Sequence, residues 1–198
     1  FTITGKYDID RGNYNFNFES LLKKPFKLSE NAGNYIQWSG DPNNATIKID
    51  AEYEAENVRF SDLGSALQGL ELGVNVARYR GKVLVIASLS EQLLAPVIKF
   101  RIELPQNSPL KNDFQALNLL RQIQSDENEL NKQVTFLVVF NSFGPLSTST
   151  NQGNLANTAF EGIVVGSISG VLSNTLSRQF SNVFQKIFND KSIRVNFR

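Results

Sequence analysis

The stretch that decides the fold is Ala45-Thr46-Ile47-Lys48-Ile49-Asp50-Ala51-Glu52-Tyr53-Glu54-Ala55. Its odd-numbered side chains are apolar, and its even-numbered side chains are polar or charged. This period of two predicts a β-strand with one dry face and one solvated face. The preceding residues, Asp41-Pro42-Asn43-Asn44, predict a turn, because proline fixes φ and asparagine tolerates left-handed backbone.

The same alternation recurs along the first half of the chain. Asp10-Arg11-Gly12 predicts a hairpin turn between the first two alternating segments, and a helical turn is predicted near 61–68. Residues 1–105 are therefore predicted to form a β-meander. Its further alternating segments are 1–9, 14–18, 26–28, 36–38, 72–76, 83–89 and 98–104.

The dry face of such a meander needs a cover. No long amphipathic helix interrupts the first hundred residues, so the sheet is expected to close on itself as a sandwich or barrel, or to stay open and receive a ligand. In the second case a curled sheet would hold acyl chains on its concave face. The residues predicted to line that apolar groove are Phe16, Phe18, Ile36, Trp38, Ile47, Ile49, Ala51 and Tyr53.

The second half of the chain changes period. Residues 106–145 are predicted to be helical, because apolar residues recur every three or four positions from Phe114 to Ile123. Asp126 is predicted to cap a second helix with Glu129 reaching back, and Gly144-Pro145 to end it. The apolar run 134–140 is also compatible with a strand, but the capping pattern favours a helix.

The last part is predicted to be a flexible loop over 146–158, followed over 159–198 by a long amphipathic helix and a terminal strand. The apolar stripe of this helix is predicted to plug the open end of the sheet or to lie at a membrane surface. The terminal strand is expected to continue in the native protein or to pair with another edge. The residues predicted to face a partner or a membrane are Ile168, Leu172, Leu176, Phe180, Val183, Ile193, Val195 and Phe197.

The composition argues against most kinds of catalytic and metal-binding site. The chain has no Cys and no His, so thiol nucleophiles, disulfides and His-ligated metals are not expected, and neither is a cofactor. The 20 Lys and Arg against 19 Asp and Glu offer no basic excess for nucleic acid. The 198-residue sequence starts at Phe1 and contains no Met, which predicts a fragment of a longer polypeptide.

Three segments carry a resemblance to a known family: 33–45, the Pro96-x-x-x-Phe100-x-Ile102-x-Leu104-Pro105 run, and 129–134. Together they resemble the C-terminal domain of TamB, the translocation and assembly module protein of the AsmA-like superfamily. Two residues differ from the family pattern: Glu91 stands where a turn glycine is expected, and Gly144 where a larger apolar residue is usual.

The resemblance implies a mainly β fold: a curled antiparallel meander sheet forming an open, β-taco-like apolar groove, with helices in the C-terminal half. It implies a periplasmic protein of a Gram-negative bacterium, anchored in the inner membrane by an N-terminal helix outside this sequence and reaching the outer membrane. The implied partners are phospholipid and a TamA-like outer-membrane barrel protein. No enzymatic activity is implied.

Two functions remain open at this point. The first is a bridge that shields and conducts phospholipid between the membranes, since each buried methylene contributes ~0.8 kcal/mol. The second is a scaffold or chaperone for outer-membrane β-barrel proteins, in which the sheet edge templates strands and the apolar face is only a core.

Overall fold

The structure is a computed structural model that describes residues 2–18, 22–67 and 73–146. The predicted loop beyond Leu146, the long helix and the terminal strand all lie outside the described residues. The elements, in chain order, are β1 (Ile3–Asp8), β2 (Asn13–Phe18), β3 (Leu22–Leu28), β4 (Tyr35–Gly40), β5 (Ala45–Val58), the 3₁₀ segment η1 (Phe60–Leu67), α1 (Val74–Ala77), β6 (Gly81–Gln92), β7 (Ala95–Glu103), α2 (Phe114–Ser125) and α3 (Glu127–Phe140).

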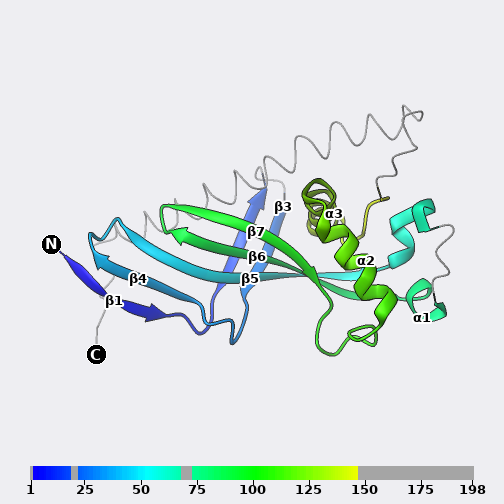
Figure 1. Cartoon of the computed structure of the whole chain (residues 1–198), viewed down its shortest axis with the longest axis horizontal. Helices are drawn as coiled ribbons and strands as arrows, with labels where there is room; N and C mark the ends of the chain where they lie inside the picture. Colours follow the sequence, from blue (N-terminus) through cyan, green and yellow to red (C-terminus); the bar gives the residue numbers. More distant parts are fainter. Residues whose placement is uncertain (1, 19–21, 68–72, 147–198) are drawn as a thin grey trace.

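One antiparallel sheet contains all seven described strands, and β5 runs through its middle (Figure 1). β6 pairs with β5 from Thr46 to Val58, and β7 pairs with β6. β1 and β2 lie at one side of the described sheet and β7 at the other, so the sheet is open. The prediction of a mainly β, open antiparallel sheet with helices in the C-terminal half is therefore confirmed.

The predicted hairpin turn at Asp10-Arg11-Gly12 is wrong. β1 pairs with β4 and β2 pairs with β3, so the chain continues past 9–12 in the same direction rather than turning back. The first four strands thus form one long antiparallel hairpin with a break halfway, at 9–12 on one arm and 29–34 on the other. In Figure 1, β3 stands at a steep angle to β1 and β4, so the hairpin bends at this break.

Asn34 forms hydrogen bonds to three segments of the chain at the break. Its side-chain oxygen accepts the Asp50 backbone N–H at 2.7 Å, and its side-chain nitrogen donates to the Ser29 carbonyl at 2.9 Å. Its own carbonyl accepts the Ile9 N–H at 2.9 Å. Asn34 is 4% exposed, and a buried amide of this kind is stable only when it is hydrogen-bonded. It supplies a hydrogen bond to β5 in the gap between the β5 residues that pair with β4 and those that pair with β3.

Between 106 and 145 the structure contains two helices, as predicted, with differences at their ends. Asp113 caps α2, and Asp126 caps α3 by accepting the Asn128 and Glu129 N–H groups, so 134–140 is helix and not strand. α3 ends at Phe140, before the predicted Gly144-Pro145 stop, and the next residue, Asn141, caps it with φ 53°. The alternation predicted at 72–76 is also wrong, because Val74–Ala77 forms a helical turn. Three alternating residues are too few to distinguish a strand from one turn of helix.

Candidate lipid-binding face

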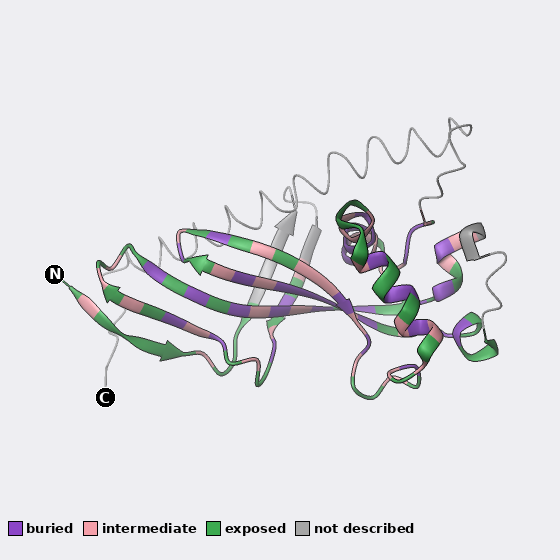
Figure 2. Cartoon of the chain, viewed as in Figure 1, coloured by how far each residue is buried: buried purple, intermediate pink, exposed green. Residues whose placement is uncertain are grey.

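Strand register brings the apolar side chains of four strands onto one face. Ile36 lies opposite Ile47, and Trp38 lies opposite Ala45. Directly opposed residues share a face, and every second residue along a strand points to it. Figure 2 shows the resulting alternation of buried and exposed residues along β5. On β6 and β7 the same face carries Val83, Val85, Ala87, Leu89, Ile98, Phe100 and Ile102.

Six of the eight residues predicted to line a groove meet on this face. Ile36, Ile47, Ile49, Ala51 and Tyr53 are 3–6% exposed, and Trp38 is partly buried. An acyl chain that contacts them must therefore displace the groups that cover them. Their contact with lipid stays a prediction.

The other two predicted residues, Phe16 and Phe18, are on β2, which pairs with β3 and not with β4 or β5. They pair with Lys24 and Leu22 of β3, beyond the break in the long hairpin. The structure describes their backbone register and not their side chains.

The rim of the face is apolar and more accessible. Trp38 on β4 and Ile98 and Phe100 on β7 are partly buried and pack against the core. Ile98 and Phe100 were not among the predicted groove residues, although their alternation with Lys99 and Arg101 places them on one face. What the sequence does not reveal is the register that sets them beside Leu89 and Ala87.

The helices close one end of this face. In Figure 1, α2 and α3 lie beside the end of the sheet where β5 finishes and β6 begins, away from the β6–β7 turn. Phe143, which follows α3, lies 5.4 Å from Phe60 between ring centroids. Gln124 of α2 accepts the Ile102 N–H of β7 at 3.2 Å. The described helices therefore cover the face at this end only.

A polar group interrupts the apolar face near the helices. Lys24 of β3 donates to the Tyr53 hydroxyl at 3.1 Å, and that hydroxyl donates to Asn141 Oδ1 at 2.6 Å. Phe26, two residues along β3, packs on the Tyr53 ring with 5.6 Å between centroids. Lys24 therefore shares the apolar face with Phe26 and Leu28.

The opposite face carries charges in a cross-strand network. Arg101 of β7 donates to Ser88 of β6 and to Asp50 of β5, the latter at 2.9 Å, and also to Glu103. Burial alone raises the pKa of Asp50, but hydrogen bonds from Arg101 and Ser88 and the positive charges of Arg101 and Lys48 outweigh it. The pKa of Asp50 therefore lies below its ordinary value.

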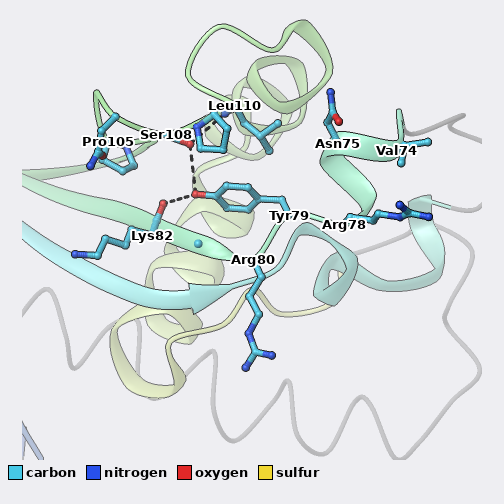
Figure 3. Close-up of a pocket in the computed structure, with 12 residues that line it drawn as sticks. Val74, Asn75, Arg78, Tyr79, Arg80, Lys82, Pro105, Ser108 and Leu110 are labelled. Atoms are coloured by element: carbon cyan, nitrogen blue, oxygen red, sulfur yellow. Dashed lines mark hydrogen bonds between the residues drawn. The ribbon is translucent and has the colours of Figure 1, made fainter.

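A separate pocket lies between α1 and the loop after β7 (Figure 3). The Tyr79 hydroxyl at its centre donates to the Lys82 carbonyl at 2.8 Å. Figure 3 shows Arg78, Arg80 and Lys82 pointing in three different directions, so the basic side chains do not converge on one ligand. Among the described residues no group of three His, Cys, Asp or Glu side chains is placed to hold a metal ion.

Comparison with known families adds an independent observation. The TamB C-terminal domain family matches residues 1–197. The chain belongs to the TamB family. The comparisons with curated proteins and with solved structures gave no match.

TamB membership places the chain in the envelope of Gram-negative bacteria, with a role in outer-membrane assembly or lipid transport and an association with the outer-membrane assembly machinery. Within the described part of the chain, no helix combines the length and the hydropathy that crossing a bilayer requires.

The TamB-like segment 129–134 has a structural role. Gln133 donates to the Gly144 carbonyl and accepts the Gly144 N–H, both at 2.8 Å. Lys132 donates to the Pro145 carbonyl at 2.8 Å and pairs with Glu129 at 2.9 Å. These bonds fold the chain after α3 back along the helix. A larger residue at position 144 would require the Phe136 ring to move, because a Cβ there would lie 2.7 Å from that ring.

Proposed function

We propose that this domain shields phospholipid acyl chains as part of a bridge across the periplasm, and that it does so without enzymatic activity. The observation that supports this is the apolar face that β4, β5, β6 and β7 share on an open sheet, of which the described helices cover only one end. Burial of each methylene group stabilises the bound lipid by about 0.8 kcal/mol, so acyl chains bind such a face without a specific polar contact.

Lipid extraction from the purified chain tests this proposal. We expect phospholipid to accompany the wild-type chain, and the amount to fall in Phe100→Ser, which makes the rim polar. Val97→Ser is the matched control, because Val97 lies on the same strand, is 37% exposed, and faces the opposite side of the sheet. Equal lipid contents in the two variants would argue against binding on this face.

A charged substitution deeper in the face separates a groove from a closed core. Ile49→Asp is expected to abolish lipid transfer between vesicles while the β-sheet signal in circular dichroism persists. Ile49 is 5% exposed, so unfolding of this variant would indicate that the face is a permanent core.

The second candidate is a scaffold for outer-membrane β-barrel proteins. The feature that favours it is the open sheet, in which β1 and β7 each pair with one strand only among the described strands. Unpaired edges accept added strands. This function requires no lipid, so a chain that assembles barrel proteins while carrying no phospholipid would support it over lipid carriage.

We further propose that the terminal segment docks on a TamA-like barrel by strand addition, because Ile193, Val195 and Phe197 alternate with polar residues. Val195→Pro removes one ladder hydrogen bond. Crosslinks from Arg194 or Asn196 to the barrel are expected to disappear in this variant. Their full retention would contradict docking through this strand.

A further inference from the structure

We propose that Lys24 and Asn141 bind the anionic head of an acyl lipid whose chains lie on the apolar face. This inference rests on the proposed lipid-binding function and adds a polar contact to it. The candidate site consists of the Lys24 ammonium group, the Tyr53 hydroxyl and the Asn141 amide, which come from β3, β5 and the end of α3.

The position of Lys24 is set by register. Leu28 lies opposite Ala51, a residue of the apolar face that is 4% exposed. Phe26 and Lys24 precede Leu28 by two and four residues, so both point to the same side of β3 as Leu28. The 5.6 Å ring contact of Phe26 with Tyr53 and the Lys24 bond to the Tyr53 hydroxyl agree with this placement.

Within the described residues, no carboxylate compensates the charge of Lys24. Its contacts with described residues are the Tyr53 hydroxyl, 3.1 Å away, and the Tyr53 ring, whose centroid is 5.4 Å away. No described carboxylate pairs with it. A partly buried cation beside apolar groups is stabilised by an anion, and none of the described residues supplies one.

The direction of the hydrogen bonds leaves donors available. Because the Tyr53 oxygen accepts from Lys24, its hydrogen is directed to Asn141 Oδ1. With respect to the residues that the structure describes, the Asn141 NH₂ group then keeps two donors, and Lys24 keeps two further N–H groups. The site therefore offers several donors and one positive charge, which suits a phosphate or carboxylate group.

The surroundings indicate an acyl lipid rather than a free anion. Phe26 is 3% exposed, and Ala51 and Tyr53 continue into the apolar face along β5. An anion at Lys24 thus has apolar residues beside it along which a hydrocarbon chain can lie. Both a phospholipid phosphate and a fatty-acid carboxylate fit this chemistry.

Three ligands with the same dodecyl chain test the inference: dodecyl phosphate, dodecanoate and dodecyl maltoside, each used below its micelle concentration. Trp38 is the only tryptophan of the 198-residue chain and lies on the apolar face, so its fluorescence reports binding. We expect the wild-type chain to bind dodecyl phosphate about tenfold more tightly than the uncharged maltoside, as for a charge-assisted hydrogen bond. A comparison with dodecanoate then separates the phosphate source from the carboxylate source.

Variants at both positions sharpen the test. Lys24→Gln is expected to remove the preference for anionic heads, and Lys27→Gln, on the opposite side of the same strand, to preserve it. Asn141→Asp is nearly isosteric and places a negative charge on the far side of the Tyr53 hydroxyl from Lys24, where it repels an anionic head, so it also is expected to remove the preference. Unfolding midpoints establish that each variant is folded.

The outcomes distinguish this inference from the proposed function. Equal binding of the three ligands by the wild-type chain, or an unchanged preference in Lys24→Gln and Asn141→Asp, would overturn the anionic site and leave lipid binding intact. Failure of every ligand to bind would overturn both. Loss of the preference in these two variants, with Lys27→Gln unaffected, supports the site.

Discussion

Asp50 contributes to stability through its charge. It links β5 to Arg101 of β7, and its pKa is lowered in the folded chain, so its contribution is present at neutral pH and is lost as the pH falls through the lowered pKa. Asp50→Asn is expected to reduce the free energy of unfolding by about 0.5–1 kcal/mol at pH 7, since the pair is partly solvated. Urea unfolding at pH 7 and at acid pH measures this. A difference from wild type that persists below the Asp50 pKa would contradict the charge-based account.

Gln133 supports the chain after α3. It is fully buried and satisfies both backbone groups of Gly144. Gln133→Leu keeps the volume but leaves these groups without their partners, at a cost of about 2–4 kcal/mol for the two. Chemical denaturation tests this, with Gln122→Leu on the exposed side of α2 as the control. Equal stability of the two variants would mean that Gly144 finds other partners.

At the scale of elements, the β6–β7 hairpin carries local strain. Glu91 has φ 73°, a region that side chains with a Cβ occupy at a cost. Glu91→Gly is expected to raise the free energy of unfolding by about 1 kcal/mol. Gln92→Gly is the matched control, because Gln92 is outside the positive-φ residues and glycine there only loosens the strand. Stabilisation by the control and not by Glu91→Gly would exclude strain as the cause.

Elements whose signals are local were predictable, and those that depend on partners were not. The alternation of 45–55 and the cap at Asp126 fix β5 and the start of α3 without help from the rest of the chain. By contrast, Asp10-Arg11-Gly12 has the composition of a hairpin turn, and only pairing with distant strands makes it a break in a continuing arm.

The candidate site follows the same rule. The apolar face was predictable because alternation assigns side chains to faces. The place of Lys24 on that face was not predictable. It follows Lys23, and the sequence of two adjacent lysines does not indicate which of them points to the apolar face. Asn141, which accepts the hydrogen bond from the Tyr53 hydroxyl, is 88 residues away from Tyr53 in sequence. No local sequence pattern connects these two residues.

At the scale of the whole molecule, we expect the protection of backbone amides from hydrogen exchange to decrease from β5 outward. β5 is paired along both edges, with β6 on one side and β3 and β4 on the other, whereas β1 lies at the outside and is exposed over most of its length. Hydrogen exchange measured by mass spectrometry is expected to be slowest in β5 and β6 and fastest in β1. Exchange in β1 as slow as in β5 would mean that another strand covers the β1 edge.

The break in the long hairpin divides the strands along one edge of β5 into two modules, β1 with β4 and β2 with β3. β4 pairs with Ala45–Lys48 and β3 with Ala51 and Glu52, and Asn34 spans the gap between them. If β1 and β4 both become longer, the register of β3 on β5 is unchanged. If β2 and β3 both become longer, the register of β4 on β5 is unchanged. Insertions and deletions in either module are accommodated separately, so the domain can vary in width during evolution while its central strand keeps its sequence.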